Sequence, residues 1–479
     1  MRQILLAALC AVIFVSCEEG VTYIEESRQA TGVKVGEVSE SSAVIWTRLT
    51  AAEERRADGL EVKGRPDRTE PGEEIKQLDP MDLHGSAPGA EGRIRLRYDS
   101  NVNFFDPVVT DWIEVDASTD FTHHFRLNGL TPATIYYYEV QTSDVAGTTQ
   151  HRPVNGRFET APPADEYATV TFTVVTGQAN RDHDDPEGFK IYPSMLDLAP
   201  SFIVPTGDTI YYDSDAPLAT SIDLARFHWH RMYSFPTLRR FHLSVPGYWE
   251  KDDHDSYHND NWPGMSREYM GTFNWDQGLQ VYAEQVPMSD LPYRTFRWGK
   301  GLQVWVVEGR DFRSPNTMED GPDKTIWGIE QKQWLKETLL ASDADWKVLI
   351  SPTPIVGPDR SNKKDNHANE AFRHEGDEMR AWFAENLPDN FFIACGDRHW
   401  QYHSVHPETG VHEFSSGPAS DEHAGGTPGE DDGYHQFHRV AGGFVSVTAA
   451  KVLDESSIVF RHHDVDGAVQ YEWSRSKKD

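Results

Sequence analysis

Apolar and polar positions alternate along the first third of the chain. "SSAVIWTRL" (41–49) and "GRIRLRYDS" (92–100) have the period of two that half-buried strands show. "THHFRLNGLTPATIYYYEVQTSD" (122–144) continues the pattern as strand, turn and strand. We therefore predict an all-β sandwich between about residue 29 and residue 162.

Two details refine this first domain. The spacing of Leu130, Pro132 and Tyr136 resembles the tyrosine corner of fibronectin type III sandwiches, in which a Tyr hydroxyl bonds back to nearby backbone. Residues 51–92 interrupt the strand pattern with a charged stretch rich in Gly and Pro, for which we expect an excursion at the surface. "TAPPADE" (160–166) then reads as a linker.

The pattern changes at about residue 163 to short, nearly continuous apolar runs, typical of strands buried on both faces. These runs are "ATVTFTVVTGQ" (168–178), "PSFIVPTGD" (200–208), "LQVWVVEGR" (302–310), "DWKVLISPT" (345–353) and "NFFIACGD" (390–397). Helix-like segments separate them, including 188–200 and 328–342, where Ile329, Trp334 and Leu335 fall at helical spacing. "GGFVSVTA" (442–449) and 456–473 read as closing strands. Residues 163–479 are thus predicted to form a layered α/β domain.

The chain is strongly acidic, with 77 Asp and Glu against 45 Lys and Arg and a formal net charge of −32. A nucleic-acid backbone or an anionic membrane surface would be repelled by this charge outside a locally basic or metal-filled site. We therefore expect no nucleic-acid-binding surface.

The N-terminus has the layout of a secretory signal. "MRQILLAALCAVIFVSC" (1–17) has an early Arg2 and an apolar run from Ile4 to Val15 that is short for a membrane span. Its end also resembles a bacterial lipoprotein box, which implies cleavage before Cys17 and a lipid on its thiol; the alternative is an ordinary signal with a chance cysteine. We expect an exported, periplasmic or cell-surface protein. After cleavage Cys395 is the one interior thiol, so no intrachain disulfide framework is available.

Carboxylates and histidines follow the buried strands. Asp208 ends "PSFIVPTGD" and precedes Tyr211, while Asp397 and His399 follow "NFFIACG". "DDHD" (252–255) lies 45 residues beyond Asp208 (253 − 208). Ligands of layered α/β folds collect outside the carboxyl ends of strands, and carboxylates packed together repel unless a cation neutralises them. The set therefore favours a metal site over a solvated acidic turn.

These stretches resemble the PhoD-like alkaline phosphatases of the calcineurin-type metallophosphoesterase superfamily. The resemblance is carried by "PSFIVPTGDTIYYD", "YWEKDDHDSYHND", "YRTFRWGKGLQVWVVEGRDFR", "WGIEQKQWL" and "FFIACGDRHW". It implies hydrolysis of phosphate mono- or diesters, of small molecules or of a polymer, at a site of two or three metal ions. Ca²⁺ and Fe³⁺ are the ions associated with the family, and the hard ligand oxygens also suit Mn²⁺ or Mg²⁺, with Zn²⁺ as a further alternative.

The resemblance also implies roles for single residues. Asp208 is similar to the carboxylate that bridges two metals, and Tyr211 to a phenolate ligand that favours ferric iron. Asp253 takes the place of a metal-binding Asn, and His254 matches the catalytic histidine of the superfamily. Asp397 and His399 stand where that superfamily has two histidine ligands.

One position departs from the family. A Cys iron ligand usually ends the first strand, and here Gly177 stands there, followed by Gln178. Either one metal lacks this ligand, or another residue replaces the Cys. The candidates for that replacement are Gln178 and the nearby acidic run Asp182, His183, Asp184 and Asp185. A solvated turn is the alternative interpretation of that run.

The remaining candidates surround the proposed metals. His254 would assist the leaving group, oriented by Asp252 or Asp255. Arg310 and Arg313 either clamp phosphate oxygens or form structural ion pairs. Two loops, 359–376 and 415–439, add further candidates. Asp365, Asn366 and His367 form either a helix entry capped by Asn366, or a lid or extra metal ligand. Glu422 and His423 lie on a Gly-rich rim from which they could reach substrate.

Other classes fit less well. "SFPTLR" (234–239) has Leu238 where a sulfatase motif requires Arg, and no HExxH zinc-peptidase stretch occurs. A non-catalytic surface lipoprotein that binds glycans through its β-sandwich, with a decayed metal centre, remains the alternative hypothesis.

Overall fold

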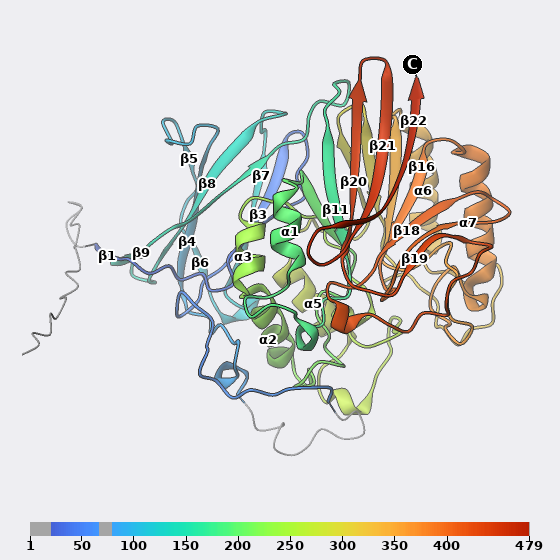
Figure 1. Cartoon of the computed structure of the whole chain (residues 1–479). Helices are drawn as coiled ribbons and strands as arrows, with labels where there is room; N and C mark the ends of the chain where they lie inside the picture. Colours follow the sequence, from blue (N-terminus) through green and yellow to red (C-terminus); the bar gives the residue numbers. More distant parts are fainter. Residues whose placement is uncertain (1–20, 67–78, 479) are drawn as a thin grey trace, which may run out of the picture.

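The structure, a computed structural model, describes residues 21–66 and 79–478. The predicted signal segment with Cys17, and residues 67–78 of the predicted insertion, lie outside the described residues. A β-rich N-terminal part precedes a larger α/β part (Figure 1). Within the described ranges, no helix combines the length and the apolar character needed to cross a membrane.

The N-terminal part contains two sheets whose inner faces share one apolar core. Alternate residues of β4 are buried, as its sequence predicted, and Leu96 and Tyr138 of the first sheet share that core with Ile45 and Phe125 of the second. The first sheet contains β1 (Thr22–Ile24), β9 (Thr149–His151), β8 (Ile135–Ser143), β4 (Gly92–Asp99) and β5 (Val108–Val109), with β10 (Val154–Glu159) paired to β8 and β6 (Ile113–Val115) paired to β4. The second contains β2 (Val33–Gly36), β3 (Ser42–Arg48) and β7 (Thr122–Asn128).

The predicted tyrosine corner is present between β7 and β8. The backbone N–H of Thr131 donates to the Tyr136 hydroxyl at 2.9 Å. This bond fixes the turn between the two strands to the ring that follows it.

The polar insertion is more than the surface excursion that its composition suggested. Leu83 packs with Leu224 and Phe227 in a small buried cluster, and the Arg55 guanidinium lies 4.3 Å from the centre of the Phe235 ring. The insertion includes η2 (Pro80–Asp82), and η3 (Ala117–Thr119) lies farther along the N-terminal part. The described insertion residues therefore pack against the helices of the α/β part.

The α/β part is built on two mixed sheets. One has the order β12 (Phe202–Pro205), β11 (Val170–Val175), β20 (Phe444–Val452), β21 (Glu455–His463) and β22 (Val469–Lys478). The other has the order β13 (Arg294–Trp298), β14 (Leu302–Val306), β15 (Trp346–Ser351), β16 (Phe391–Cys395), β18 (His412–Ser416), β17 (Gln401–Val405) and β19 (His435–Arg439). β11 and β12 are parallel, as are β14, β15, β16 and β18.

The two sheets form the inner layers, and helices cover their outer faces (Figure 1). Val304 and Val306 point into the core between the sheets, whereas Trp305 and Val307 pack with the outer helices, which explains why this strand is apolar throughout. α6 (Gly328–Ala341) and α7 (Arg373–Asn386) cover the seven-stranded sheet. α1 (Ile191–Asp197), α2 (Ile222–Tyr233), α3 (Pro236–His242) and α5 (Trp275–Gln285) belong to the core on the other side.

The apolar side of α6 differs from the one suggested by the sequence. Ile329 is 80% exposed, and the buried side chains of the helix are Gln331, Leu335 and Leu339. Gln331 is buried because its side chain bonds both the N–H and the carbonyl of Glu308. A polar side chain with a specific backbone partner thus takes a core position.

Candidate metal centre

The predicted site residues meet at the carboxyl ends of β12 and β16. Asp208 follows β12 and Asp397 follows β16, and both have a left-handed backbone, with φ of 53° and 61°. Residues other than Gly seldom adopt this conformation, and such outliers concentrate at functional sites. The two "GD" strand ends therefore present their carboxylates through the same unusual turn.

Glycine lets these loops approach closely. A Cβ on Gly207, whose φ is 87°, would lie 2.4 Å from the Cβ of Asp252. A Cβ on Gly396 would lie 2.4 Å from the Thr206 hydroxyl oxygen. The absence of side chains at these two positions brings the β12 end, the β16 end and the "DDHD" segment together.

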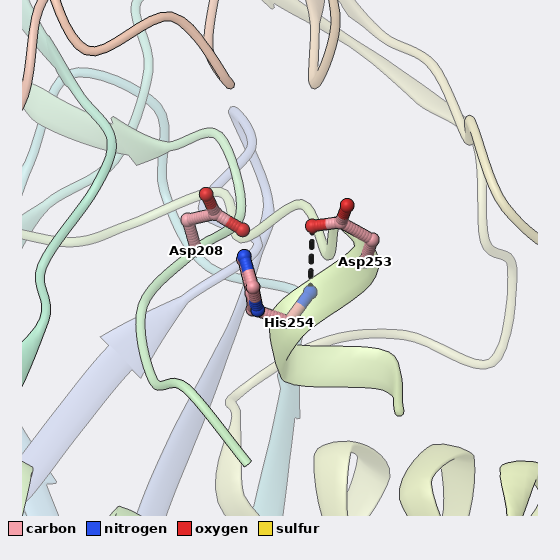
Figure 2. Close-up of side chains that lie close together, drawn as sticks. All are labelled: Asp208, Asp253 and His254. Carbon is pink, nitrogen blue, oxygen red and sulfur yellow. Dashed lines mark hydrogen bonds between the residues drawn. The ribbon is translucent and has the colours of Figure 1, made fainter. Parts of the chain in front are cut away.

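Two overlapping groups of potential metal ligands result. Asp208, Asp253 and His254 have ligand atoms within 4.8 Å of one another, and Figure 2 shows the His254 ring beside the Asp208 carboxylate. Asp208, Asp252 and Asp397 form the second group, at the same limit. Asp208 belongs to both groups, which is the arrangement that a bridging carboxylate requires.

The charges of this cluster are unbalanced. Burial, opposed by His254 and reinforced by Asp253 and Asp255, raises the pKa of Asp208 to about 8. Among the described residues, Oδ1 of Asp208 and Oδ2 of Asp252 are buried without a hydrogen-bond partner. Buried carboxylate oxygens that lack a protein donor fit cation ligands, so the residues present suit a metal centre.

Asp213 orients His254. Its Oδ1 lies 2.5 Å from Nδ1 of the ring, and the His254 backbone N–H donates to Asp253 at 2.7 Å (Figure 2). Burial lowers the pKa of His254, but the carboxylates, Asp213 first, raise it to about 10. Asp255, which with Asp252 had been considered for this role, instead accepts from the backbone N–H groups of Asp252 (2.6 Å) and Thr209 (3.1 Å). It shapes the loop at the start of the one-turn helix α4 (Asp253–Ser256).

Tyr211 and His399 also surround Asp208, and the Tyr211 ring lies 4.3 Å from the His254 ring. The Tyr211 hydroxyl donates to Asp208 Oδ2 at 3.0 Å, and His399 Nε2 lies 3.3 Å from the same hydroxyl. His423, from η7 (Asp421–His423), places its Nε2 at 2.9 Å from that hydroxyl. The structure therefore brings a residue of the Gly-rich rim into the cluster.

The two predicted replacements for the missing Cys behave differently. The Gln178 side-chain oxygen accepts a hydrogen bond from Tyr192, and Gln178 approaches the centre through its backbone N–H, which donates to the Asp208 carbonyl. In the acidic run, Asp182 in η4 (Asn180–Asp182) contacts His423 Nδ1 at 2.7 Å. His183, Asp184 and Asp185 bond local backbone groups of residues 180, 190 and 187.

The two arginines are internal to the site. Arg310 is 0% exposed, and its Nε lies 2.5 Å from Asp252 Oδ1, so the structure places it in a buried ion pair. Arg313 donates to the Asp365 carbonyl. Both guanidinium groups offset carboxylate charge beneath the metal-facing oxygens.

The 359–376 loop supplies a third carboxylate group, formed by Asp365 with Asp253 and Asp260. Lys363 pairs with Asp260 at 2.6 Å, and Arg398 lies 3.8 Å from Asp365, so cationic side chains already serve this group. His367 bonds Glu375 at 3.1 Å, and Asn366 bonds Asp359 at 2.9 Å, ahead of η6 (Glu370–Phe372). The loop is a buried support of the site.

A cavity of about 1190 Å³ opens beside the centre, with His399 and His423 in its wall. Its lining combines the insertion, the loop after β11, α2, α3 and the Gly-rich rim. Among the described residues, six Lys or Arg and five Asp or Glu line it, whereas the whole chain has 45 and 77, so this described lining is much less acidic than the molecule. The six cationic residues are Arg55, Lys63, Arg65, Arg181, Arg231 and Arg360.

Comparison with known families decides the relationship. Residues 172–454, more than half of the chain, match the family "PhoD-like phosphatase", and residues 16–162 match "PhoD-like phosphatase, N-terminal domain". The chain belongs to the PhoD-like phosphatase family. The resemblance read from the strand-end residues is thereby confirmed.

One curated relative of this PhoD-like chain is alkaline phosphatase D of Bacillus subtilis (strain 168), 26% identical over 359 residues. The match covers 66% of this chain and 54% of that protein, so it spans about half the length of the relative.

Two solved structures share the fold. "Structure of PhoD" superposes with a TM-score of 0.70 at 17% identity, covering 94% of this chain and 91% of that one. Purple acid phosphatase PPD1 from yellow lupin superposes with a TM-score of 0.63 at 12% identity, covering 92% and 73%. The predicted fold class is confirmed: a metallophosphoesterase-like α/β part preceded by a β-rich domain.

Two residues of the cluster have contacts that no sequence pattern predicts: Asp213, and His423, which the sequence places only on the Gly-rich rim. Asp213 contacts His254 across 41 residues, and nothing in "DSD" (213–215) distinguishes it from other acidic turns. His423 lies in a segment without strand or helix pattern. A search for histidines in loops that follow the late strands would have retained His423 as a candidate ligand.

Proposed function

We propose that this protein is a metal-dependent phosphoesterase that hydrolyses phosphate mono- or diesters with a metal-activated water. The observation that carries the proposal is Asp208, a buried carboxylate shared by two ligand groups at the strand ends of a PhoD-like fold. Cations bound there would lower the pKa of a water and would stabilise the charge on the attacking and leaving oxygens.

The protein's own residues supply the arrangement around that chemistry. Asp208, Asp252, Asp253 and Asp397 would hold the ions, with Tyr211 and His399 beside Asp208. His254, held by Asp213, donates a hydrogen bond to the phosphoryl group or a proton to the leaving alcohol. The Asp213 carboxylate favours the protonated form of this ring, which is the form that can donate.

The ester enters through the cavity beside His399 and His423. Its lining balances acidic and basic side chains, which lowers the barrier to an anionic substrate that the rest of this acidic molecule would repel. We propose two resident ions, because the third carboxylate group is already paired with Lys363 and Arg398. Oxygen ligands suit Ca²⁺, Mg²⁺ or Mn²⁺ on the Asp252 side.

We also propose that residues 1–17 direct export and that Cys17 carries a lipid anchor. The support is the early Arg2, the apolar run and the cysteine at the end of the segment. The Cys17→Ala variant should lose incorporation of labelled fatty acid and move from the membrane fraction to the periplasm or medium. Unchanged membrane association of the variant would remove the anchor from this proposal.

Hydrolysis of p-nitrophenyl phosphate and bis-p-nitrophenyl phosphate tests the activity. We expect turnover of at least one ester, loss of turnover after chelation, recovery on addition of metal, and no recovery in Asp208→Asn. The preferred ester separates a monoesterase from a diesterase. If neither ester is hydrolysed with calcium, iron or manganese supplied, the glycan-binding hypothesis takes its place.

A further inference from the structure

Three potential ligand atoms surround the phenol oxygen of Tyr211 beside Asp208. The hydroxyl oxygen of Tyr211 lies 3.0 Å from Asp208 Oδ2, 3.3 Å from His399 Nε2 and 2.9 Å from His423 Nε2. His399 Nε2 in turn lies 3.8 Å from Asp208 Oδ2. The phenol oxygen therefore lies within 3.3 Å of three side chains that can bind a metal ion.

We propose that His423 is a metal ligand that completes a site with Asp208, Tyr211 and His399. The inference rests on the proposed function, since it concerns one of the two ions of the same centre. It assigns to the Gly-rich rim a ligand that the strand-end residues do not provide.

The hydrogen-bonding capacity of the cluster supports a cation. Asp182 lies 2.7 Å from His423 Nδ1, closer than the 3.5 Å contact of Arg181 with the same nitrogen. When Asp182 accepts the Nδ1–H, Nε2 is left with a free lone pair directed at the Tyr211 hydroxyl. The Nε2 lone pair, the phenol oxygen and Asp208 Oδ2 are then all available as ligands of a cation.

The Asp182–His423 contact is also the outer support expected of a ligand. A histidine that binds a metal commonly donates its other ring N–H to a carboxylate, which fixes its tautomer and ring orientation. Arg181 holds Asp182 at 3.2 Å and Asp215 at 2.6 Å. The imidazole of His423 is therefore positioned from behind by a carboxylate and an arginine.

The backbone at Gly177 lies against the rim that supplies this ligand. Gly177 has a φ of 61°, and a Cβ there would lie 3.4 Å from Cδ2 of His423 and 3.1 Å from Cβ of Pro418. A side chain at position 177 would therefore press first on Pro418 and would lie in contact with the His423 ring. The loop after β11 and the Gly-rich rim are neighbours at this point.

The donor set also predicts which metal binds. Two imidazole nitrogens with one phenolate and one carboxylate suit a transition ion such as Fe³⁺ or Zn²⁺. Ca²⁺ and Mg²⁺ prefer sites made of oxygen alone. We assign the transition ion to the His423 side of Asp208 and the alkaline-earth ion to the Asp252 side.

The test compares His423→Ala with Asp182→Asn, which keeps the ring, and with the control His374→Ala, an exposed histidine on α7. Each purified protein is dialysed against Zn²⁺ or loaded with Fe³⁺. Bound metal is then counted, and the visible charge-transfer band of phenolate-bound iron is recorded. We expect at least about a tenfold loss of affinity for the transition ion in both site variants, a changed band, and retained Ca²⁺ binding.

The outcomes separate the two proposals. A parent protein that binds no metal would overturn the proposed function itself. A parent that binds metal, with unchanged transition-metal affinity and an unchanged band in His423→Ala, would overturn only the role of His423. The Asp182→Asn variant gives the same answer without truncating a buried ring, should His423→Ala fail to fold.

Discussion

At the scale of single residues, the pair Asp213 and His254 sets the protonation of the site. Asp213 is buried, and its Oδ1 lies 2.5 Å from Nδ1 of the His254 ring. Burial lowers the pKa of His254, and the charge of Asp213 is the largest of the contributions that raise it. The Asp213→Asn variant keeps the size of the side chain but removes that charge.

We expect Asp213→Asn to lower kcat by about 10- to 100-fold, the usual cost of losing a carboxylate that orients a functional histidine. Only the protonated ring can donate a proton, and the variant lowers the pKa of His254. As the pH is raised, the variant should therefore lose activity at a lower pH than the parent. The pH profile of kcat measures this shift. Asp223→Asn, on the exposed face of α2, is the control, and an unshifted alkaline limb in Asp213→Asn would count against His254 as the proton donor.

Gly207 offers a second test at this scale. An Ala side chain there would meet Asp252 at 2.4 Å and would also strain a backbone with φ of 87°. Gly207→Ala should therefore lose metal affinity by at least about tenfold and stability by about 1–3 kcal/mol. Gly410→Ala is the matched control, because Gly410 has a φ of 71° with no atom within 4 Å of the added Cβ.

Equal metal affinity in the two glycine variants would show that the close approach of the β12 loop to Asp252 is unimportant. Bound calcium, counted after equilibrium dialysis, is the measurement.

The individual residues also show what could be predicted from the sequence. Asp208, Asp253, His254, Asp397 and His399 were candidates because each is close to a strand end or in a dense acidic run, and the structure brings them together. Asp213 and His423 were not assigned these contacts because each depends on how distant loops fold over the sheet edge. The orientation of Gln178 was equally beyond the sequence, since its partner Tyr192 lies on another element.

At the scale of elements, apolar runs predicted the buried strands well, because a strand covered on both faces needs apolar residues at every position. Helix faces were predicted less well. α6 buries Gln331 and exposes Ile329, since hydrogen bonds to Glu308 outweigh the apolar preference at the first turn. The insertion runs over the surface at 51–66, as predicted, but Leu83 packs against α2, a contact that its polar composition did not indicate.

His462 on β21 gives a prediction about pH at this scale. The ring is fully buried, and its Nε2–H donates to the carbonyls of Tyr402 and Ser415 at 3.1 Å, which joins the two central sheets. Burial lowers its pKa to about 3. In the unfolded chain the ring is protonated below about pH 6.5, whereas in the folded chain it stays neutral until about pH 3. The contribution of the buried ring to stability is therefore present above about pH 6.5 and is lost as the pH falls toward 3.

The His462→Gln variant keeps a donor but cannot titrate. Between pH 6 and pH 4 its free energy of unfolding should fall less steeply than that of the parent, by up to about 1.4 kcal/mol per pH unit. Urea unfolding at several pH values measures the slope. If the slope of His462→Gln equals that of the parent and of the control His374→Gln, this ring does not contribute to acid sensitivity.

At the scale of the whole molecule, the metals are expected to hold the two halves of the site together. Without cations, Asp208, Asp252 and Asp397 place like charges within 4.8 Å in a buried environment. Chelation should therefore lower the melting temperature, and calcium or iron should restore it, with about 2.7 kcal/mol gained at a metal concentration of 100 Kd.

Asp208→Asn makes this prediction specific. At about pH 9, above the pKa of about 8 to which burial raises Asp208, the variant should be less stable than the parent when metal is present, because it loses a ligand. After chelation at that pH it should be as stable or more stable, because it loses a repelling charge. Thermal unfolding with and without chelator shows whether this reversal occurs. A variant that is less stable in both conditions would indicate that Asp208 supports the fold independently of metal.

The most direct measurement is the metal content of the purified protein and of Asp208→Asn, determined on the same samples used for ester hydrolysis. We predict two ions per chain in the parent, fewer in the variant, and hydrolysis that rises and falls with occupancy. A parent that contains no metal under every loading condition would contradict the proposal of a metal-dependent phosphoesterase. So would a parent that hydrolyses both esters as well after complete chelation as before it.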